Sequence, residues 1–149
     1  MIDLTDQPLD LAPMMAHLHA ASAGGVCVFV GVTREDQQGD QKLLALDYSA
    51  YDAMARKQLE DLADRARAKW PIQRLVLVHR IGRVALAEPS VVVGVATPHR
   101  PESFEACRWL IDTLKSELTV WKKDIWQGGG ESWTKPNKES FSTLDDPAA

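Results

Sequence analysis

Apolar residues recur at two different spacings along the chain, and each spacing predicts a different kind of element. Two long segments carry them three and four positions apart, which is typical of a helix with one buried face. The first begins at Asp52, a potential helix cap, and runs to about Trp70, where Pro71 stops it. Its predicted buried stripe consists of Ala55, Leu59, Leu62 and Ala66.

The second long helix is predicted over residues 101–118. Its predicted stripe, with the same spacing, consists of Phe104, Cys107, Ile111, Leu114 and Leu118. A shorter helix is predicted from Leu11 to Ala21, because Pro13 suits a first helical turn and two glycines follow the end of the segment.

Runs of β-branched and aromatic residues, or alternating apolar and polar residues, predict strands between these helices. The predicted strands cover residues 25–33, 43–50, 73–81, 84–87 and 90–97, and the polar residues 34–42 are predicted to form a loop or hairpin connection. In the second strand, Leu44, Leu46 and Tyr48 are expected to share one face. Because short segments join neighbouring strands, we predict an α+β fold with a mainly antiparallel sheet and about three helices.

Composition narrows the class of protein. The 149 residues are enough for one domain, which we assign to residues 1–136, and the polar residues 137–149 are predicted to be a flexible tail. A formal net charge of −4 argues against a general nucleic-acid or anionic-membrane surface. The sequence contains neither a run of roughly 20 apolar residues nor the pattern of a signal peptide. We therefore expect a cytoplasmic protein that binds neither nucleic acid nor a membrane.

Basic residues cluster around the second long helix. His99 and Arg100 precede it, Lys115 lies near its end, and Lys122 and Lys123 follow it. The free N–H groups and the positive dipole end of a helix start favour an anion, so this segment predicts a site for a small anionic substrate. Lys115 lies about 70° from the centre of the apolar stripe, at its boundary. A solvated lysine near a helix C-terminus is the alternative explanation of that position.

The remaining reactive side chains give no second site. Cys27 and Cys107 fall at predicted core positions without an activating partner, so they are interpreted as small apolar filler rather than a disulfide or a nucleophile. No cluster of Cys and His has the spacing of a zinc site, so no metal is expected.

Several segments together resemble the large, catalytic subunit of molybdopterin synthase. They are GGVCVFVGVTR (24–34), LDYSAYDAM (46–54), LVHRIGRV (77–84), the long segment from Val93 to Asp124 containing TPHRPESFEA and VWKKD, and ESWTK (131–135). The resemblance implies a hammerhead-type α+β fold and the conversion of cyclic pyranopterin monophosphate to molybdopterin, with no tightly bound cofactor. It also implies a sulfur-carrying partner, a small ubiquitin-like subunit with a C-terminal Gly-Gly thiocarboxylate, and a homodimer within a heterotetramer.

The same resemblance implies roles for individual residues. Lys115 and Lys122 would be catalytic and would also contact the substrate. The other substrate-binding residues would be Arg34, His99, Arg100, Lys123 and Asp124. The chain departs from the family at Asp124, where a glutamate is common, and in the loop after Arg34, which lacks the usual asparagine or histidine.

Two other functions are compatible with the residues alone. One is a non-catalytic regulatory module that binds an anion or nucleotide in the same basic pocket. The other is an interaction protein in which the region of Trp121 and Trp126 is a docking surface. Product formation with a thiocarboxylated partner would distinguish the enzyme from both.

Overall fold

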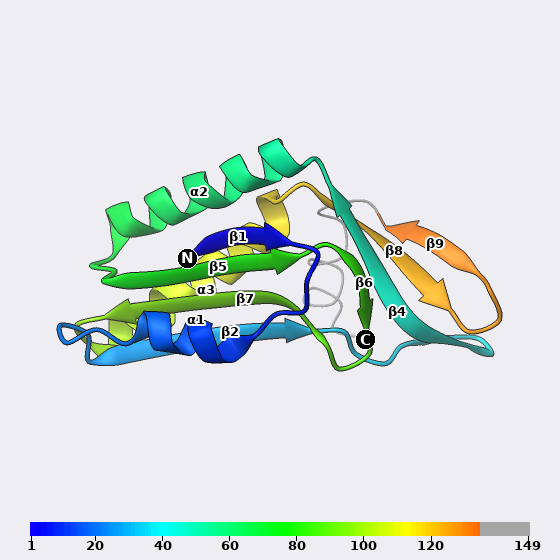
Figure 1. The fold of residues 1–149 in the computed structure, drawn as a ribbon, viewed down its shortest axis with the longest axis horizontal. Coiled ribbons are helices and arrows are strands. Elements are labelled where there is room, and N and C mark those ends of the chain that lie inside the picture. Colours follow the sequence, from blue (N-terminus) through cyan, green and yellow to red (C-terminus); the bar gives the residue numbers. More distant parts are fainter. Residues whose placement is uncertain (135–149) are drawn as a thin grey trace, which may run out of the picture.

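The computed structural model describes residues 1–134, which form two β-sheets and three helices (Figure 1). The helices are α1 (Leu11–Leu18), α2 (Asp52–Lys69) and α3 (Arg100–Glu117). The first sheet has the strand order β1 (Ile2–Thr5), β5 (Arg74–Arg80), β7 (Pro89–Thr97) and β2 (Gly25–Val32). The second has the order β3 (Gln37–Gln38), β4 (Gln41–Ala50), β8 (Val120–Trp126) and β9 (Glu131–Thr134), and β6 (Gly82–Ala85) pairs with the other edge of β4.

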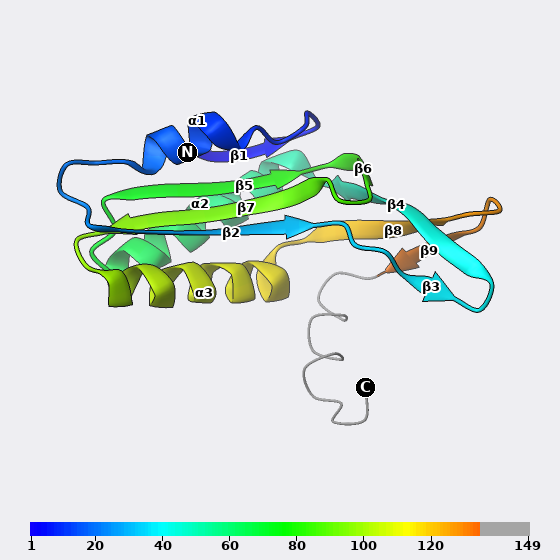
Figure 2. The ribbon, with the colours of Figure 1, turned by 90° about the horizontal axis from the view of Figure 1, so that it is seen from below.

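The first sheet lies between two helical layers. Helix α1 covers one face and α3 the other, as Figure 2 shows, and α2 shares with α3 the core on the α3 side. This arrangement explains the uninterrupted apolar sequence of β7, because a central strand that is covered on both faces has no solvent-facing side. The larger part of the core, on the α2 and α3 side, contains Leu77 of β5, Val93 of β7 and Leu110 of α3, all fully buried.

The prediction of an α+β fold is confirmed. Among the strands of residues 1–134, β1 and β5 are parallel and the other pairs are antiparallel. None of the three helices is both long and apolar enough to cross a membrane. The predicted tail, residues 137–149, lies outside the described residues.

Four strands were not predicted from the sequence, and one of them is the two-residue β3 within the predicted loop or hairpin connection. β1 is short and precedes the first predicted helix, while β8 and β9 have mixed polar and aromatic sequences without a clear period. β1 and β8 are stabilised by pairing with β5 and β4, which lie far away in the chain, and a local pattern does not reveal such pairing. β9 then forms a hairpin with β8. α1 also ends earlier than predicted, at Leu18, because the backbone becomes extended at His19.

Two of the predicted core faces are wrong in detail. Phe104 is 62% exposed, and the helix instead buries Ser103, Ala106 and Leu110 beside Cys107. Both rows satisfy a spacing of three and four, and the glycine at the start of β2 lets the sheet approach the Ser103 row closely.

In β4, Leu44 is exposed whereas Leu43 and Ala45 are buried, so Leu44 does not share the face of Tyr48. An irregular register between Leu43 and Ala45 interrupts the alternation. The predicted cap of α2 is also displaced by one residue. Tyr51 occupies the N-cap position without a side-chain cap, and the Asp52 carboxylate accepts a hydrogen bond from Arg56.

Candidate functional site

Lys115 lies in the last turn of α3, beside the second sheet. The residue as a whole is exposed, yet protein atoms surround its amine closely enough to alter its protonation. Loss of hydration is the larger cause and the positive charge of Lys122 the smaller, and both lower the pKa of the Lys115 ammonium below its ordinary value. Lys115 of α3 and Lys122 of β8 are therefore electrostatically coupled in the fold, although they belong to different elements.

The strand β8 presents Lys122 and Lys123 to opposite sides of the second sheet, because successive side chains of a strand alternate. Lys122 stands directly opposite Tyr48 of β4, so these two side chains share one face. Lys123 stands opposite Asp47, and its amine lies 4.0 Å from the Asp47 carboxylate and 3.4 Å from that of Glu131. It also lies 5.2 Å from the ring centre of Trp133.

Asp124 follows Lys122 by two residues and stands opposite Leu46, so it shares the Lys122 face. The predicted substrate-binding set is thus divided. Lys122 and Asp124 lie on the face of Tyr48, while Lys123 is engaged with carboxylates on the other face.

A buried histidine completes the surroundings of the two lysines. His79, near the end of β5, is only 3% exposed, and the edge of its ring meets Tyr48 with the ring centres 5.1 Å apart. Burial, which is the largest cause, and the charge of Lys115 lower the pKa of His79 to about 4. Sequence patterns did not single out His79 because it reads as one position of an apolar strand.

His99 and Arg100 lie at the opposite end of α3 from Lys115. His99 occupies the N-cap position without a side-chain cap bond, and Arg100 is the first helical residue; both are exposed. Fifteen residues separate Arg100 from Lys115, so their backbones lie about 22 Å apart along the helix. Within one copy of the chain, His99 and Arg100 therefore lie at one end of α3 and Lys115 at the other.

Arg34 belongs to the Lys115 end. β2 begins at Gly25, where an added Cβ would lie 3.1 Å from the Cα of Arg100, and runs seven residues to Val32, about 23 Å away. Arg34 follows that far end and is exposed. The structure therefore places Arg34 at the same end of the first sheet as Lys115, and His99 and Arg100 at the other end.

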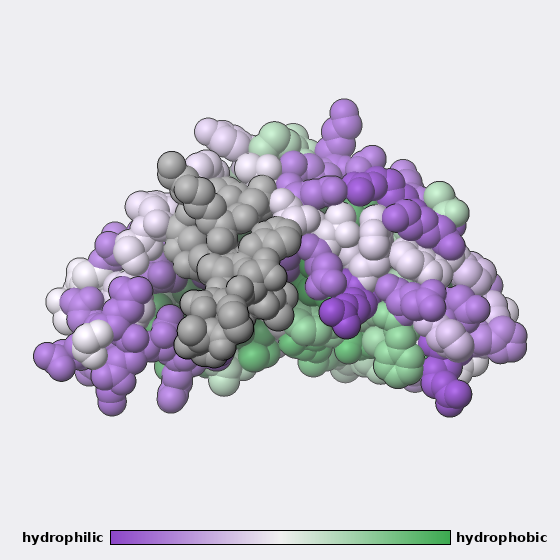
Figure 3. All heavy atoms as spheres, turned by 180° about the vertical axis from the view of Figure 1, so that it is seen from behind, coloured by the Kyte–Doolittle hydropathy of each residue, from purple (hydrophilic) through white to green (hydrophobic). Residues whose placement is uncertain are grey.

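The outer edge of the first sheet is apolar. β2 is the last strand of its sheet, and its side chains Val26, Phe29 and Val32 are 38%, 41% and 52% exposed. Phe104 of α3 is exposed as well. The space-filling view of Figure 3 shows an apolar band along the lower side of the molecule, the side on which β2 lies in Figure 1. Sequence reasoning missed this surface because the same residues were interpreted as core.

The two cysteines lie beside each other between β2 and α3. Cys107 is buried, with its Sγ 3.6 Å from the carbonyl oxygen of Val93, while Cys27 is half-buried. The pKa of the Cys107 thiol is raised to about 12, mainly by burial and further by the adjacent Cys27. The interpretation of Cys107 as apolar filler without an activating partner agrees with this environment.

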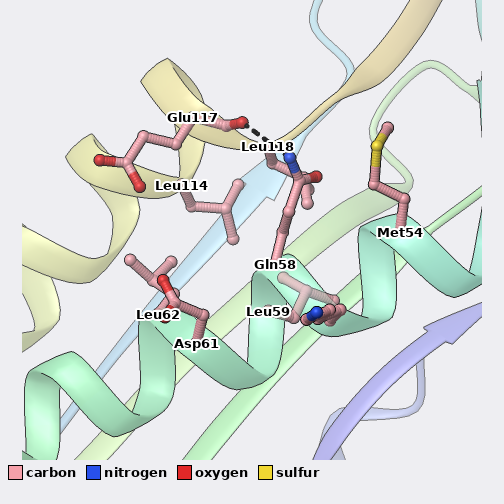
Figure 4. Close-up of a pocket in the computed structure, with 9 residues that line it drawn as sticks. Met54, Gln58, Leu59, Asp61, Leu62, Leu114, Glu117 and Leu118 are labelled. Atoms are coloured by element: carbon pink, nitrogen blue, oxygen red, sulfur yellow. Dashed lines mark hydrogen bonds between the residues drawn. The ribbon is translucent and has the colours of Figure 1, made fainter.

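A groove between α2 and α3 encloses a cavity of about 370 Å³ (Figure 4). Leu59, Leu62, Leu114 and Leu118 form much of its lining, and Gln58 closes one end by donating hydrogen bonds to the Glu117 carbonyl and the Thr119 hydroxyl. This apolar groove contains neither Lys115 nor Lys122. It therefore does not suit an anionic substrate, and the basic cluster is the better candidate site.

Two further observations limit the alternatives. Trp126 is 3% exposed and its indole N–H donates to Ser132, so Trp126 contributes to packing rather than to a docking surface shared with Trp121. In residues 1–134, no group of three or more His, Cys, Asp or Glu side chains is placed to hold a metal ion.

Comparisons with known proteins agree with this architecture. A family model described as "MoaE protein" matches residues 4–117. The molybdopterin synthase catalytic subunit of Drosophila erecta is 41% identical over 141 residues, which are 94% of this chain and 38% of that protein. The protein of the same description from Thermoplasma volcanium is 39% identical over 132 residues, which are 89% of this chain and 96% of the relative. The chain thus spans well under half of the Drosophila relative but nearly all of the archaeal one.

Solved structures show the same fold. The crystal structure of molybdopterin synthase from Staphylococcus aureus superimposes with a TM-score of 0.83 at 32% identity, covering 89% of this chain and 96% of that one. A protein–protein complex of subunits 1 and 2 of molybdopterin-converting factor from Helicobacter pylori contains a chain with a TM-score of 0.73 at 20% identity, covering 95% of this chain and 93% of that one. At that identity the likeness concerns the fold alone.

Proposed function

Because the chain belongs to the MoaE family of molybdopterin synthase catalytic subunits, we propose that it converts cyclic pyranopterin monophosphate to molybdopterin by sulfur transfer. The observation that carries this proposal is the coupling of Lys115 to Lys122 at a basic site, in a chain that matches the archaeal catalytic subunit over almost its full length. Residues 1–136 would form the catalytic domain, acting in the cytoplasm without a tightly bound cofactor.

The sulfur would come from a small ubiquitin-like partner whose C-terminal Gly-Gly carries a thiocarboxylate. Its sulfur would attack a side-chain carbon of the substrate and replace a carbon–oxygen bond there, and the displaced oxygen would leave as the opened end of the cyclic phosphate in one transfer and as water in the other. Water then cleaves the acyl carbon–sulfur bond, which releases the partner's carboxylate and leaves the sulfur on the substrate. Two such transfers give the dithiolene. The absence of an activated thiol at Cys107 supports an external sulfur donor.

The two lysines would serve this chemistry in different ways. Negative charge develops at the reacting carbonyl and on the leaving group, and an ammonium at Lys122 can stabilise it. Lys115, with its lowered pKa, exchanges a proton more readily at neutral pH than an ordinary lysine, so it can move protons to and from the reacting atoms. Arg34, His99 and Arg100 would hold the cyclic phosphate and the pterin as fixed cationic or hydrogen-bonding donors. Asp124 would line the site beside Lys122, whereas Lys123 would contact Asp47 and Glu131 on the other face of the sheet.

A homodimer would bring the separated basic residues together. If two copies meet along the apolar β2 edge about a two-fold axis, the Gly25 end of one strand lies beside the Val32 end of the other. His99 and Arg100 of one copy would then approach Arg34 and Lys115 of the partner copy. One small subunit bound at each end of this dimer would complete a heterotetramer.

The decisive experiment mixes the purified chain with thiocarboxylated small subunit and cyclic pyranopterin monophosphate, and measures dithiolene product. We expect product from the wild type and a loss of at least about a hundredfold in turnover for Lys115→Ala, as for a residue that acts in the transition state. Lys57→Ala, a change on α2 at the apolar groove, is the matched control and should keep full turnover. No product from the wild type would refute the proposed function, and full turnover by Lys115→Ala would refute the role of Lys115.

A further inference from the structure

A buried histidine lies behind the two lysines and has no part in the proposed chemistry so far. His79 pairs in register with Val91, whose side chain belongs to the core that α3 covers. His79 is therefore on the α3 face of the first sheet, where only 3% of its surface reaches solvent. A buried imidazole is costly unless its polar atoms are satisfied, so its contacts reveal which form the fold has selected.

One ring nitrogen of His79 identifies the tautomer of the neutral ring. Nδ1 lies 2.7 Å from the carbonyl oxygen of Arg80, and a carbonyl only accepts, so Nδ1 carries a hydrogen and donates it. In the neutral ring, Nε2 then holds a lone pair. The edge of the same ring meets Tyr48 at an interplanar angle of 76°, and Tyr48 stands opposite Lys122 across the β4–β8 pair. His79 thus contacts the residue that shares a face with one of the two lysines.

We propose that His79 is a positioning residue of the reaction, a neutral ring that fixes Tyr48 opposite Lys122 and gives Lys115 an uncharged wall. The inference rests on the proposed function, because it assigns His79 a part in the chemistry of the same two lysines. Histidine suits the position since it combines an aromatic edge, a donor to the Arg80 carbonyl and the absence of charge.

The charges around the ring agree with this role. Around His79, Tyr48 of β4 contacts the ring and Lys115 of α3 is close enough for its charge to act on it, with Lys122 of β8 beyond Tyr48. The residues paired with His79 on β1 and β7 are the apolar Leu4 and Val91. On its own strand, the Arg80 guanidinium is committed to Glu88 at 2.9 Å. Burial and the Lys115 charge lower the pKa of His79 to about 4, so the ring is neutral at pH 7.

An uncharged wall matters for the proton chemistry of Lys115. A carboxylate at this position would stabilise the ammonium and hold its proton, which would remove the effect of burial and of Lys122 on Lys115. A neutral donor in place of the imidazole would preserve that effect. A carboxylate at position 79 should therefore raise the pKa of Lys115, whereas a neutral donor should leave it unchanged, although both substitutions remove the histidine ring.

The experiment compares His79→Asn with His79→Glu in the full chain. Asparagine can place its amide N–H near the position of Nδ1 and stays neutral, whereas glutamate adds a negative charge. The pKa of the Lys115 amine is measured by NMR of lysine labelled with ¹³C at Cε, and the signal is assigned with Lys115→Arg. The dependence of kcat and KM on pH is measured in the complex with the thiocarboxylated partner.

For His79→Asn we expect the Lys115 pKa and the pH profile of the wild type, with kcat about threefold lower at every pH because the ring contact with Tyr48 is lost. For His79→Glu we expect the Lys115 pKa to rise by about one unit, with kcat about tenfold lower at pH 7 and recovered at higher pH, because a nearby opposite charge favours the protonated amine. KM should be unchanged in both variants, since neither substitution removes a group that contacts the substrate.

Two results would overturn the inference. One is an unchanged Lys115 pKa in folded His79→Glu; the other is an equal loss of kcat at every pH in both variants, which would show a purely structural role. If His79→Glu does not fold, His79→Phe replaces it. Phenylalanine keeps a ring against Tyr48 but cannot donate to Arg80, so kcat should fall about tenfold below that of His79→Asn. Equal kcat in His79→Phe and the wild type would overturn the inference as well. The NMR measurement needs no substrate, so it tests His79 even if the wild-type complex makes no product.

Discussion

The thiol of Cys107 should be almost inert, and this prediction separates sulfur supplied by a partner from sulfur carried by the chain itself. Cys107 is 3% exposed, and burial beside Cys27 raises the pKa of its thiol to about 12. At pH 8, such a thiol is ionised in about one molecule in ten thousand, compared with about one in four for an ordinary cysteine with a pKa near 8.5. Because the thiolate is the nucleophile, alkylation of Cys107 should be at least about a thousandfold slower than that of an exposed cysteine.

The assay is alkylation of the native chain by iodoacetamide at pH 8, with the labelled peptides quantified by mass spectrometry over time. The same chain in urea gives the rate for an accessible cysteine, and the half-buried Cys27 is an internal reference. Labelling of Cys107 in the native chain as fast as in urea would refute the assignment of this thiol to a closed core.

The matching functional variant replaces both cysteines by alanine. Removing the two sulfur atoms should cost about 1–2 kcal/mol of unfolding free energy, since the packing contact with Val93 is lost, but turnover should stay within about twofold of the wild type. Complete loss of turnover in a double variant that is still folded would mean that sulfur passes through the chain's own thiols, and the proposed route from the partner would be wrong.

Three further predictions address the pH dependence, the dimer and the entry to α3. Since the pKa of His79 is lowered to about 4 in the folded chain and is 6.5 in the unfolded chain, stability should be full above pH 6.5 and decrease as the pH falls toward 4. The free energy of unfolding should decrease by roughly 3 kcal/mol. Urea unfolding at several pH values should show this decrease in the wild type and not in His79→Asn. Equal slopes of unfolding free energy against pH in the two proteins would contradict the prediction. Mixing inactive Lys115→Ala and Arg100→Ala chains should restore about a quarter of wild-type turnover, because half of the re-formed dimers contain one intact shared site; no recovery after verified subunit exchange would contradict a shared site. Gly24→Ala places a Cβ 2.7 Å from the Pro98 carbonyl oxygen, so it should shift the start of α3 and destabilise the chain by about 1–3 kcal/mol. KM should rise several-fold in that variant with little change in kcat, and an unchanged KM would contradict the placement of substrate-binding residues there.

Local sequence determined much of the secondary structure. Leu59 and Leu62 mark the buried face of α2, and the apolar sequence of β7 marks a strand covered on both sides. These predictions succeeded because the spacing of apolar residues directly reflects which side of an element is buried. The position of Lys115 at the end of a helix, and its place at the edge of the apolar stripe, could also be read from the sequence.

Tertiary structure decided which of these elements meet. Lys122 faces Tyr48 only because β8 pairs with β4, and His79 lies behind Lys115 only because α3 covers the face of the first sheet that carries His79. Similarly, the sequence placed Arg100 and Lys115 on one helix, but the length of α3 separates them, and we propose that a second copy across the β2 edge unites them. The physical reason is that strand pairing and burial of charge depend on contacts between residues distant in the chain. A periodic pattern shows which face of an element is buried, but it does not specify the neighbour that buries it.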